Sequence, residues 1–321
     1  MKLQTLMPLS GADNQIGYGS QIFLVGSCFA AHMGAKLWYF KFQTAQNPHG
    51  ILFHPLAIKK MVARALEDVQ YTEADIFFHN ERWHCLDAHS SISDVSPEKV
   101  LHALNRGLAQ TREWVGKASH MVITLGTAWV YRSAETGKIV ANCHKLPQES
   151  FYKELLSIDD ISESLGFLIR GIGRINPSAQ LIFTVSPVRH LRDGFIENQR
   201  SKSHLLAALH HTLGEKGDME RARYFPAYEM MMDELRDYRF YERDLVHPNA
   251  LAVDYIWQRF KEVWVLGEAN GTMVEVDKIQ KGLQHQPFNA RSKAHRIFLE
   301  DLSHKIHILK GRFPFMEFDM P

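Results

Sequence analysis

Short, unbroken apolar runs alternate with helical patterns along the first 265 residues of the chain. Runs at 22–25, 121–125 and 181–185 each end at a glycine or a serine, which is typical of buried parallel strands. Apolar residues spaced by three or four follow the first run and indicate one face of a helix: Phe29, Met33, Leu37 and Phe40. This alternation predicts an α/β fold in which helices cover both faces of a parallel sheet.

Weaker patterns complete the architecture. Hairpins are predicted at 76–86 and 129–140, a short strand within 43–50 and a last strand at 222–228. Further helices are predicted by apolar spacing and by proline or asparagine at their ends: 55–68, 97–115, 158–175, 201–213 and 249–265.

The helical pattern continues through residues 274–309, where basic side chains outnumber acidic ones. We therefore expect one α/β domain over residues 1–265, with a hairpin-and-helix insertion around 70–118. A helical, basic C-terminal extension is expected over residues 266–321.

Charge and composition narrow the classes of function. The 37 basic and 36 acidic residues give a formal net charge of +1, without the basic excess of a nucleic-acid-binding domain. No apolar run approaches the roughly 20 residues that a membrane span needs. Three cysteines cannot form a disulfide framework, and the N-terminus has no signal-peptide pattern. We expect a cytoplasmic protein with no nucleic-acid partner and no membrane span.

Histidines and cysteines lie close together at two places in the chain. His84, Cys85 and His89 form one group, and Cys143 with His144 forms the other. Neither group has the spacing of a zinc site, so the sequence predicts no metal and no other cofactor.

Candidate chemistry gathers where the predicted strands end. Ligands of open parallel sheets bind outside the carboxyl ends of the strands. Four segments fall there, at 26–27, 47–50, 126–127 and 186–190, and a fifth, at 244–249, precedes the last helix of the α/β domain.

Ser27 lies in the turn between the first strand and its helix, and it has two interpretations. It can be the N-cap of the helix, which spacing alone favours because serine is a common cap. It can also be a nucleophile, because the helix N-terminus offers N–H groups and a positive dipole end to a developing oxyanion.

Asp244 and His247 are the candidate base pair for such a nucleophile. A serine nucleophile needs a base, and the base needs a partner that fixes its tautomer. An aspartate three residues before a histidine, in a turn closed by Pro248, can place its carboxylate against the ring. The alternative is a helix-capping aspartate beside a surface histidine, and only the combination with Ser27 distinguishes the two.

The chain resembles the GSCFA family in several separate motifs. The first block, residues 23–30, reads FLVGSCFA and contains the five letters for which that family is named. Similar segments follow in the same order: 47–51, 125–131, 141–145, 184–190, and 238–241 leading to Asp244 and His247. The resemblance covers roughly residues 21–260. It implies a place in the SGNH, or GDSL-like, hydrolase group, with a three-layer α/β/α sandwich and a flavodoxin-like parallel sheet.

The resemblance also implies a role for each matching residue. Ser27 matches the nucleophile, His247 the catalytic base and Asp244 its partner. Gly50 matches the glycine whose backbone N–H serves the oxyanion hole, and the N–H of Ser27 is a further donor.

One position departs from the wider hydrolase group. Ala128 stands where that group has an asparagine, whose side chain is an oxyanion donor. Loss of one such donor typically lowers the rate by about 10²–10³. Thr127 and Asn142 are the candidates to replace it.

Four basic residues are candidates for binding an anionic or sugar part of a substrate. Arg189 and His190 follow a predicted strand end, and Arg200 and Lys202 are expected to open the next helix. Basic residues are unfavourable in the first turn of a helix, which favours a functional reason for them. A solvated surface is the alternative.

These expectations combine into one hypothesis and two rivals. The first is a carboxylic-ester hydrolase that acts on a short acyl or acetyl ester, possibly on a carbohydrate, through Ser27, His247 and Asp244 and an acyl-enzyme. An O-acyltransferase would use the same site. A non-catalytic ligand-binding module on the same fold is the rival that the missing asparagine motivates. The expected partner is thus a small-molecule or glycan ester, and the sequence leaves the oligomeric state open.

Overall fold

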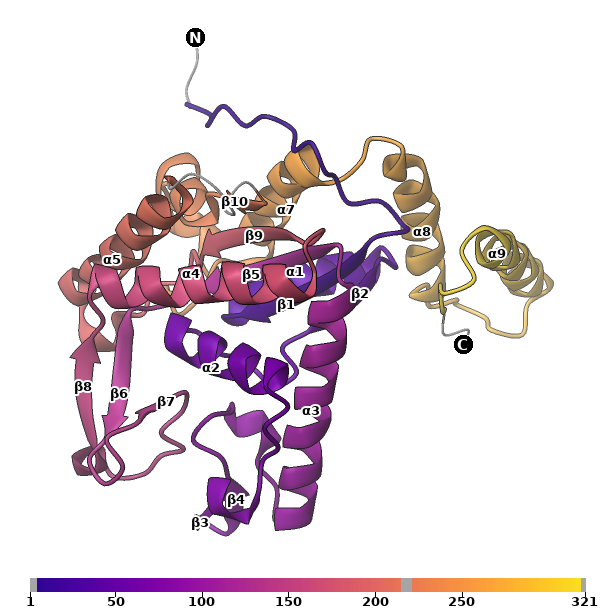
Figure 1. The fold of residues 1–321 in the computed structure, drawn as a ribbon. Coiled ribbons are helices and arrows are strands. Elements are labelled where there is room, and N and C mark those ends of the chain that lie inside the picture. The colour runs from indigo at the N-terminus through magenta and orange to yellow at the C-terminus, as the bar shows by residue number, and fades with distance from the viewer. Residues whose placement is uncertain (1–4, 215–220, 319–321) are drawn as a thin grey trace.

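A five-stranded parallel sheet forms the centre of the computed structural model, which describes residues 5–214 and 221–318 (Figure 1). Its strands are β1 (Gln21–Gly26), β2 (Gln43–Gln46), β5 (His120–Leu125), β9 (Gln180–Val185) and β10 (Ala222–Tyr224). They lie in the order β10-β9-β5-β1-β2, and every neighbouring pair is parallel. Numbered along the chain, this is the order 2-1-3-4-5 of a flavodoxin-like sheet. The predicted α/β fold class is confirmed.

Both faces of the sheet are buried, because successive side chains of a strand point to opposite faces. Phe23 and Val25 of β1 pack in one core, whereas Ile22 and Leu24 pack in the other. The first core is covered by α2 (Pro55–Leu66), α4 (Ile158–Ile175) and α5 (Phe195–Gly214), with the end of α3 (Pro97–Lys117). The second is covered by α1 (Cys28–Tyr39) and α7 (Ala250–Trp264).

A small antiparallel sheet extends from the end of β5. It has the order β7-β6-β8 and consists of β6 (Trp129–Ser133), β7 (Ile139–Val140) and β8 (Phe151–Leu155). The pairing of β6 with β7 confirms the predicted hairpin. The sequence pattern missed β8, because β8 is half exposed and its residues FYKEL do not form an apolar run.

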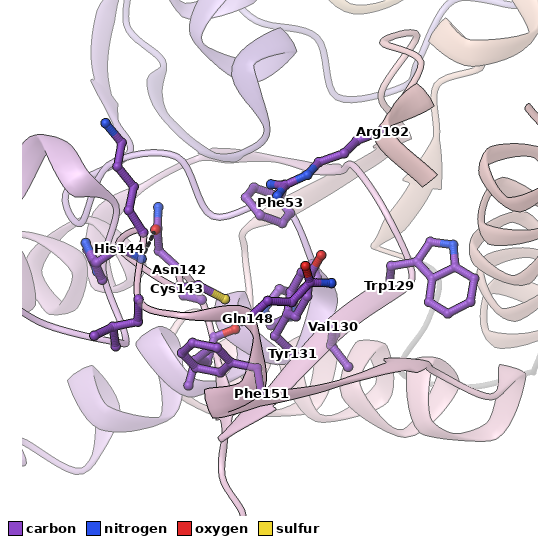
Figure 2. Close-up of a pocket in the computed structure, with 15 residues that line it drawn as sticks. Phe53, Trp129, Val130, Tyr131, Asn142, Cys143, His144, Gln148, Phe151 and Arg192 are labelled. Atoms are coloured by element: carbon purple, nitrogen blue, oxygen red, sulfur yellow. Dashed lines mark hydrogen bonds between the residues drawn. The ribbon is translucent and has the colours of Figure 1, made fainter. Parts of the chain in front are cut away.

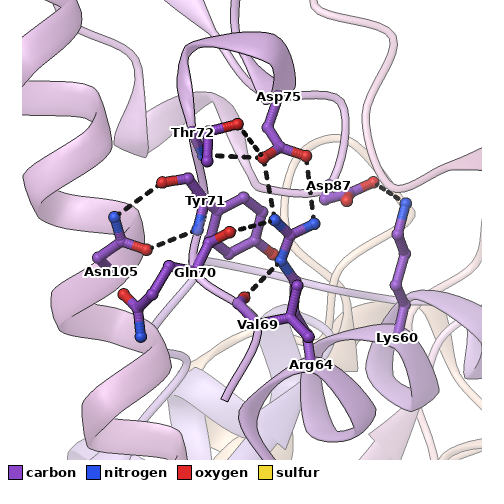
Figure 3. A network of polar contacts seen from close by, with 9 residues as sticks. All are labelled: Lys60, Arg64, Val69, Gln70, Tyr71, Thr72, Asp75, Asp87 and Asn105. Atoms are coloured by element: carbon purple, nitrogen blue, oxygen red, sulfur yellow. Dashed lines mark hydrogen bonds and ion pairs between the residues drawn. The ribbon is translucent and has the colours of Figure 1, made fainter. Parts of the chain in front are cut away.

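Polar contacts of Arg64 and Lys60 on α2 hold the insertion against the domain, and Lys60 pairs with Asp87 at 2.6 Å (Figure 3). The insertion contains the predicted hairpin, β3 (Phe77–His79) and β4 (Arg82–His84). Arg64 on α2 pairs with Asp75 at 2.9 Å and donates to the carbonyl oxygens of Val69 and Gln70 at 2.9 and 2.8 Å. Asn105 on α3 exchanges two hydrogen bonds with the backbone of Tyr71.

The C-terminal extension is helical, as predicted, and consists of α8 (Ala269–Leu283) and α9 (Lys293–Arg312). Met273, Val276 and Ile279 of α8 belong to the same core as α1 and α7. The extension therefore completes one face of the α/β domain. α9 buries only Leu302, Ile306 and Leu309.

Some boundaries differ from the prediction. α5 begins at Phe195 and not near Ser201, so the expectation that Arg200 and Lys202 open this helix is wrong. Phe195 and Ile196 are exposed, and an apolar pattern alone does not reveal a helical turn without a buried face. α7 begins after Asn249, whose side chain caps it by accepting from Ala252 N–H at 3.1 Å, so Pro248 lies just before the helix. A short α6 (Ala227–Glu229) occupies the end of the predicted last strand.

Within residues 5–214 and 221–318, none of the helices combines the length and the apolar character needed to cross a bilayer.

Gly26 ends β1 where this strand passes closest to β5. Its φ is +132°, and a Cβ at this position would overlap the carbonyl oxygen of Thr124 on β5. Only glycine avoids this overlap, because it has no Cβ and because the Thr124 carbonyl belongs to backbone that the sheet holds in place.

We predict that Gly26→Ala lowers the free energy of unfolding by about 2 kcal/mol or more, since strain and overlap combine. Urea unfolding followed by circular dichroism measures this change. Gly116→Ala is the control, because Gly116 lies in α3 with open space around it. There alanine should be neutral or stabilise by up to about 1 kcal/mol. Equal effects of the two substitutions would contradict the prediction.

Candidate functional site

The candidate site lies where β1 and β5 meet in the sheet. β2 lies on one side of β1, and β5 begins the run of strands on the other side, so the strand order reverses here. Open α/β sheets bind their ligands at such a point, beyond the carboxyl ends of the strands. Ser27 follows β1 at this edge and is the N-cap of α1, as the capping interpretation predicts. Its Oγ accepts from the N–H of Phe29 at 3.3 Å, and the residue is 1% exposed.

The backbone around Ser27 is held by two neighbouring strands. The N–H of Ser27 donates to Thr124 O on β5 at 3.1 Å. The N–H of Gly26 donates to Asn47 Oδ1 after β2, at 2.9 Å. Asn47 adopts a left-handed conformation, with φ 42°, which asparagine tolerates better than most residues. Sequence reasoning assigned no role to Asn47, although an asparagine before a proline at a strand end is a recognisable signal.

Asp244 and His247 form the pair that their spacing predicts. Asp244 Oδ2 lies 2.7 Å from His247 Nδ1, and Asp244 Oδ1 accepts from the N–H groups of Val246 and His247. Hydrogen bonds from His247 hold the pKa of Asp244 at about 2, so the carboxylate is charged at neutral pH. A carboxylate at this position favours a proton on Nδ1, and that tautomer leaves Nε2 free of hydrogen.

The turn that carries this pair is tied to the same sheet edge. The N–H of Arg189, after β9, donates to Val246 O at 3.1 Å. The charge of His247 lowers the pKa of His32 on α1 and of His190 after β9, although burial is the larger cause for both. His247 thus lies between α1 and the segment after β9. Within the described part of the chain, it makes no hydrogen bond to Ser27.

The oxyanion candidates have partners of their own. The N–H of Gly50, where φ is +73°, donates to Asn47 O at 2.8 Å. The hydroxyl of Thr127 is buried and lies 2.9 Å from Ser201 Oγ. Asn142 Oδ1 accepts from the N–H of His144 at 2.8 Å. Ala128 is buried, and its N–H donates to the same Ser201 hydroxyl at 2.7 Å.

The four basic candidates occupy different environments. The Arg189 guanidinium lies 4.5 Å from the ring centre of Tyr241, beside the turn that carries His247. Arg200 is exposed and lies 3.8 Å from Glu197 on the same helix. No contact between Arg200 and the groups at the sheet edge is found among the described residues.

Lys202 is fully buried beneath the sheet edge. Its ammonium donates to Gly126 O at 2.6 Å and to Ser186 O at 2.8 Å, which joins the ends of β5 and β9. Burial lowers the pKa of Lys202 to about 7. A neutral amine still has two hydrogens for these two carbonyls. Its burial was readable from sequence, because Lys202 is three residues before Leu205 on the apolar face of α5.

His190 places a ring nitrogen without a partner at this edge. Its Nε2 is buried and has no hydrogen bond among residues 5–214 and 221–318. A Cβ added to Gly126 would lie 3.3 Å from this nitrogen, so His190 borders the end of β5. Burial, with smaller effects of Lys202 and His247, lowers the pKa of His190 to about 3, so the ring is neutral.

A cavity of about 530 Å³ adjoins this edge through Phe53 (Figure 2). Phe53 O accepts from the N–H of Gly126 at 2.7 Å, and the Phe53 side chain lines the cavity. Asn142, Cys143 and Arg192 line it from other segments of the chain. The sequence predicted Asn142 as an oxyanion candidate, but it did not identify Phe53 or Arg192 as site residues.

Two further possibilities for this region were a reactive thiol at Cys28 and a metal site. Burial raises the pKa of the Cys28 thiol, which favours packing over a reactive thiolate. In residues 5–214 and 221–318, no three histidine, cysteine, aspartate or glutamate side chains gather in a way that could hold a metal ion.

Comparisons with known proteins identify one family. The model of the GSCFA family matches residues 21–260, the same bounds that the motifs indicated. A second model, described as the C-terminal domain of the GSCFA domain protein, matches residues 276–320. A search of curated proteins gives no match.

We predict that Lys202→Met destabilises the protein by about 1–3 kcal/mol above pH 9, because two buried carbonyls lose their donor. Between about pH 7 and 10.5 the unfolded lysine keeps its proton while the folded one loses it. The unfolded state then binds more protons, so wild-type stability rises with pH in this window.

Urea unfolding at several pH values measures this dependence. The difference between the wild type and Lys202→Met should grow from pH 7 to pH 10. Lys99→Met, at an exposed position of α3, should leave the pH dependence unchanged. A difference that shrinks with rising pH would contradict a buried lysine of lowered pKa.

Proposed function

The chain belongs to the GSCFA family, and we propose that it is a serine hydrolase of the SGNH type that cleaves a carboxylic ester. Ser27 is the nucleophile, His247 the general base and Asp244 the group that orients it. The observation that carries this proposal is the 2.7 Å contact between Asp244 and His247 on a turn bonded to the edge where Ser27 lies.

The reaction would proceed in two proton-balanced steps. Ser27 Oγ attacks the ester carbonyl while its proton moves to His247 Nε2, and the alcohol then leaves with that proton as the acyl-enzyme forms. Water attacks the acyl-enzyme, gives a proton to His247, and the proton returns to Ser27 as the acid departs. An alcohol in place of water would make the same site an acyltransferase.

The contact between Ser27 and His247 must tighten for this chemistry. Catalytic hydrogen bonds are often long without substrate and close in the complex. His247 is about half exposed, with its side chain 43% accessible, so its ring has room to move. Asp244 moves with it because its carboxylate is hydrogen-bonded to the backbone of Val246 and to the backbone and ring of His247.

The oxyanion would find donors at the start of α1 and beside β5. Cys28 is the first residue of α1, so its N–H has no intrahelical partner. His190 Nε2 borders Gly126 without a partner. We assign to His190 the place of the missing asparagine, since the Thr127 hydroxyl is buried against Ser201. The N–H groups of Ser27 and Gly50, the other expected donors, already have acceptors.

A binding module without catalysis is the second candidate. The observation that favours it is Ala128, whose buried side chain offers no donor at the position of the asparagine. The two candidates differ in whether Ser27 is activated.

A fluorophosphonate probe tests the activated serine. We expect labelling of the wild type, none of Ser27→Ala, and a rate lower by about 10²–10⁴ in His247→Ala. Gel fluorescence over time gives the rates. Ser203→Ala on α5 is the control and should label like the wild type, because its hydroxyl is exposed. A folded wild type that does not label would support the binding module.

The role of His190 is tested by steady-state kinetics. His190→Ala should lower kcat by about 10²–10³ with little change in KM, as expected for a donor that acts in the transition state. His190→Gln should recover part of kcat, because its amide can donate from a similar reach. His102→Ala, exposed on α3, is the control. Unchanged kcat in His190→Ala would remove His190 from the oxyanion site.

A further inference from the structure

The cavity beside Phe53 has an unbalanced charge. Lys145 and Arg192 are among its lining residues, which include no aspartate and no glutamate. Neither cation forms an ion pair within residues 5–214 and 221–318. Two unpaired cations at one cavity produce a local positive potential that attracts anions.

The loop that carries Arg192 is held in place at both ends. The N–H of His190 donates to Asn198 Oδ1 at 2.8 Å. Asp193 forms an ion pair with Lys153 on β8. Because its neighbours are fixed in this way, Arg192 stays at the cavity although its own side chain is exposed.

The charge of Arg192 acts on Cys143, another residue that lines the cavity. Burial raises the pKa of the Cys143 thiol to about 11, and Arg192 opposes this rise. The guanidinium therefore lies near Cys143, and both residues line the cavity. Figure 2 shows Arg192 and Cys143 entering the cavity from different segments.

Aromatic side chains line much of the rest of the cavity. Phe53, Trp129, Tyr131 and Phe151 are among its lining residues, and the rings of Tyr131 and Phe151 meet edge to face at 6.4 Å. A volume of about 530 Å³ lies in the range of pockets that hold small organic ligands. Aromatic walls with a cation at the rim suit a ring that carries a negative charge.

The cavity is connected by backbone bonds to the edge where Ser27 lies. Leu52 N–H donates to Gly26 O at 3.1 Å, and Phe53 O accepts from the N–H of Gly126. Phe53 therefore separates the cavity from the turns that follow β1 and β5. A ligand in the cavity would have to pass this one side chain to reach Ser27.

We propose that this cavity binds a ring-bearing oxyanion, a carboxylate or a phosphate, that forms the non-reacting part of the substrate. The proposal rests on the proposed esterase function, because that function places the ester bond at Ser27. Arg192 binds the oxyanion, since a planar guanidinium matches the two oxygens of either group. The aromatic walls contact the ring.

Paired esters test this specificity. The wild type should hydrolyse 4-acetoxybenzoate with a higher kcat/KM than its neutral analogue 4-acetoxybenzamide. Arg192→Gln should lose about 10- to 100-fold on the anionic ester and little on the neutral one, because the charge-assisted hydrogen bonds of the guanidinium are removed. Arg106→Gln, at an exposed position of α3 outside the cavity, should keep the wild-type preference. A preference that Arg192→Gln leaves unchanged would overturn the proposal.

Binding to a variant without the nucleophile separates this proposal from the esterase function. Ser27→Ala should bind benzoate more tightly than benzamide in calorimetry, and the added Arg192→Gln substitution should abolish the difference. Anion binding without ester hydrolysis would retain the cavity assignment and remove the esterase. Ester hydrolysis without anion binding would retain the esterase and remove the cavity assignment. Phenyl phosphate in the same titration identifies the source, since the tighter of the two anions is the class that the cavity prefers.

Discussion

The structure depends on the close approach of β1 and β5 at the end of β1. Gly26 permits this approach because a Cβ there would overlap the backbone of Thr124. The same approach lets Ser27 N–H bond to Thr124 O, while Asn47 takes the N–H of Gly26. Ser27 is thus placed by a backbone hydrogen bond to β5 and, through Gly26, by the side chain of Asn47 after β2. Such contacts position a side chain more precisely than a loop of its own could.

Burial then sets the electrostatics of the site. His190 and Lys202 lie beneath or beside the sheet edge, and burial favours their neutral forms. Asp244 is exposed and charged, so the charge of the proposed triad lies at the surface. The neighbouring cavity is lined by Lys145 and Arg192, which form no ion pair in the described part of the chain. A neutral reaction centre beside a positive binding cavity suits an ester whose charge lies away from the bond that breaks.

The insertion and the C-terminal helices support this arrangement from two sides. The N–H of His89 donates to His49 O at 3.0 Å, and the His49 ring packs against Tyr71. Arg64 lies 3.8 Å from the ring centre of Tyr71, so the insertion braces the turn that contains Gly50. On the opposite face, α8 completes the core under α1. The helix that begins at Ser27 therefore rests on residues from the far end of the chain.

Local patterns determined the fold class, because apolar runs and their periods reflect burial on one or two faces and so predicted the sheet and most helices. The Asp244–His247 turn was predicted from the spacing of these two residues before Pro248, and the candidate triad from that spacing together with the family resemblance. The apolar patterns missed β8, and they placed Lys202 in the first turn of a helix because they did not register the exposed turn at Phe195. Only the tertiary structure decided that Lys202 joins two strand ends, that His190 lacks a partner and that Arg192 faces a cavity. These properties arise between segments that are far apart in the chain. Distance and desolvation decide there what a side chain can do, and no local pattern encodes either of them.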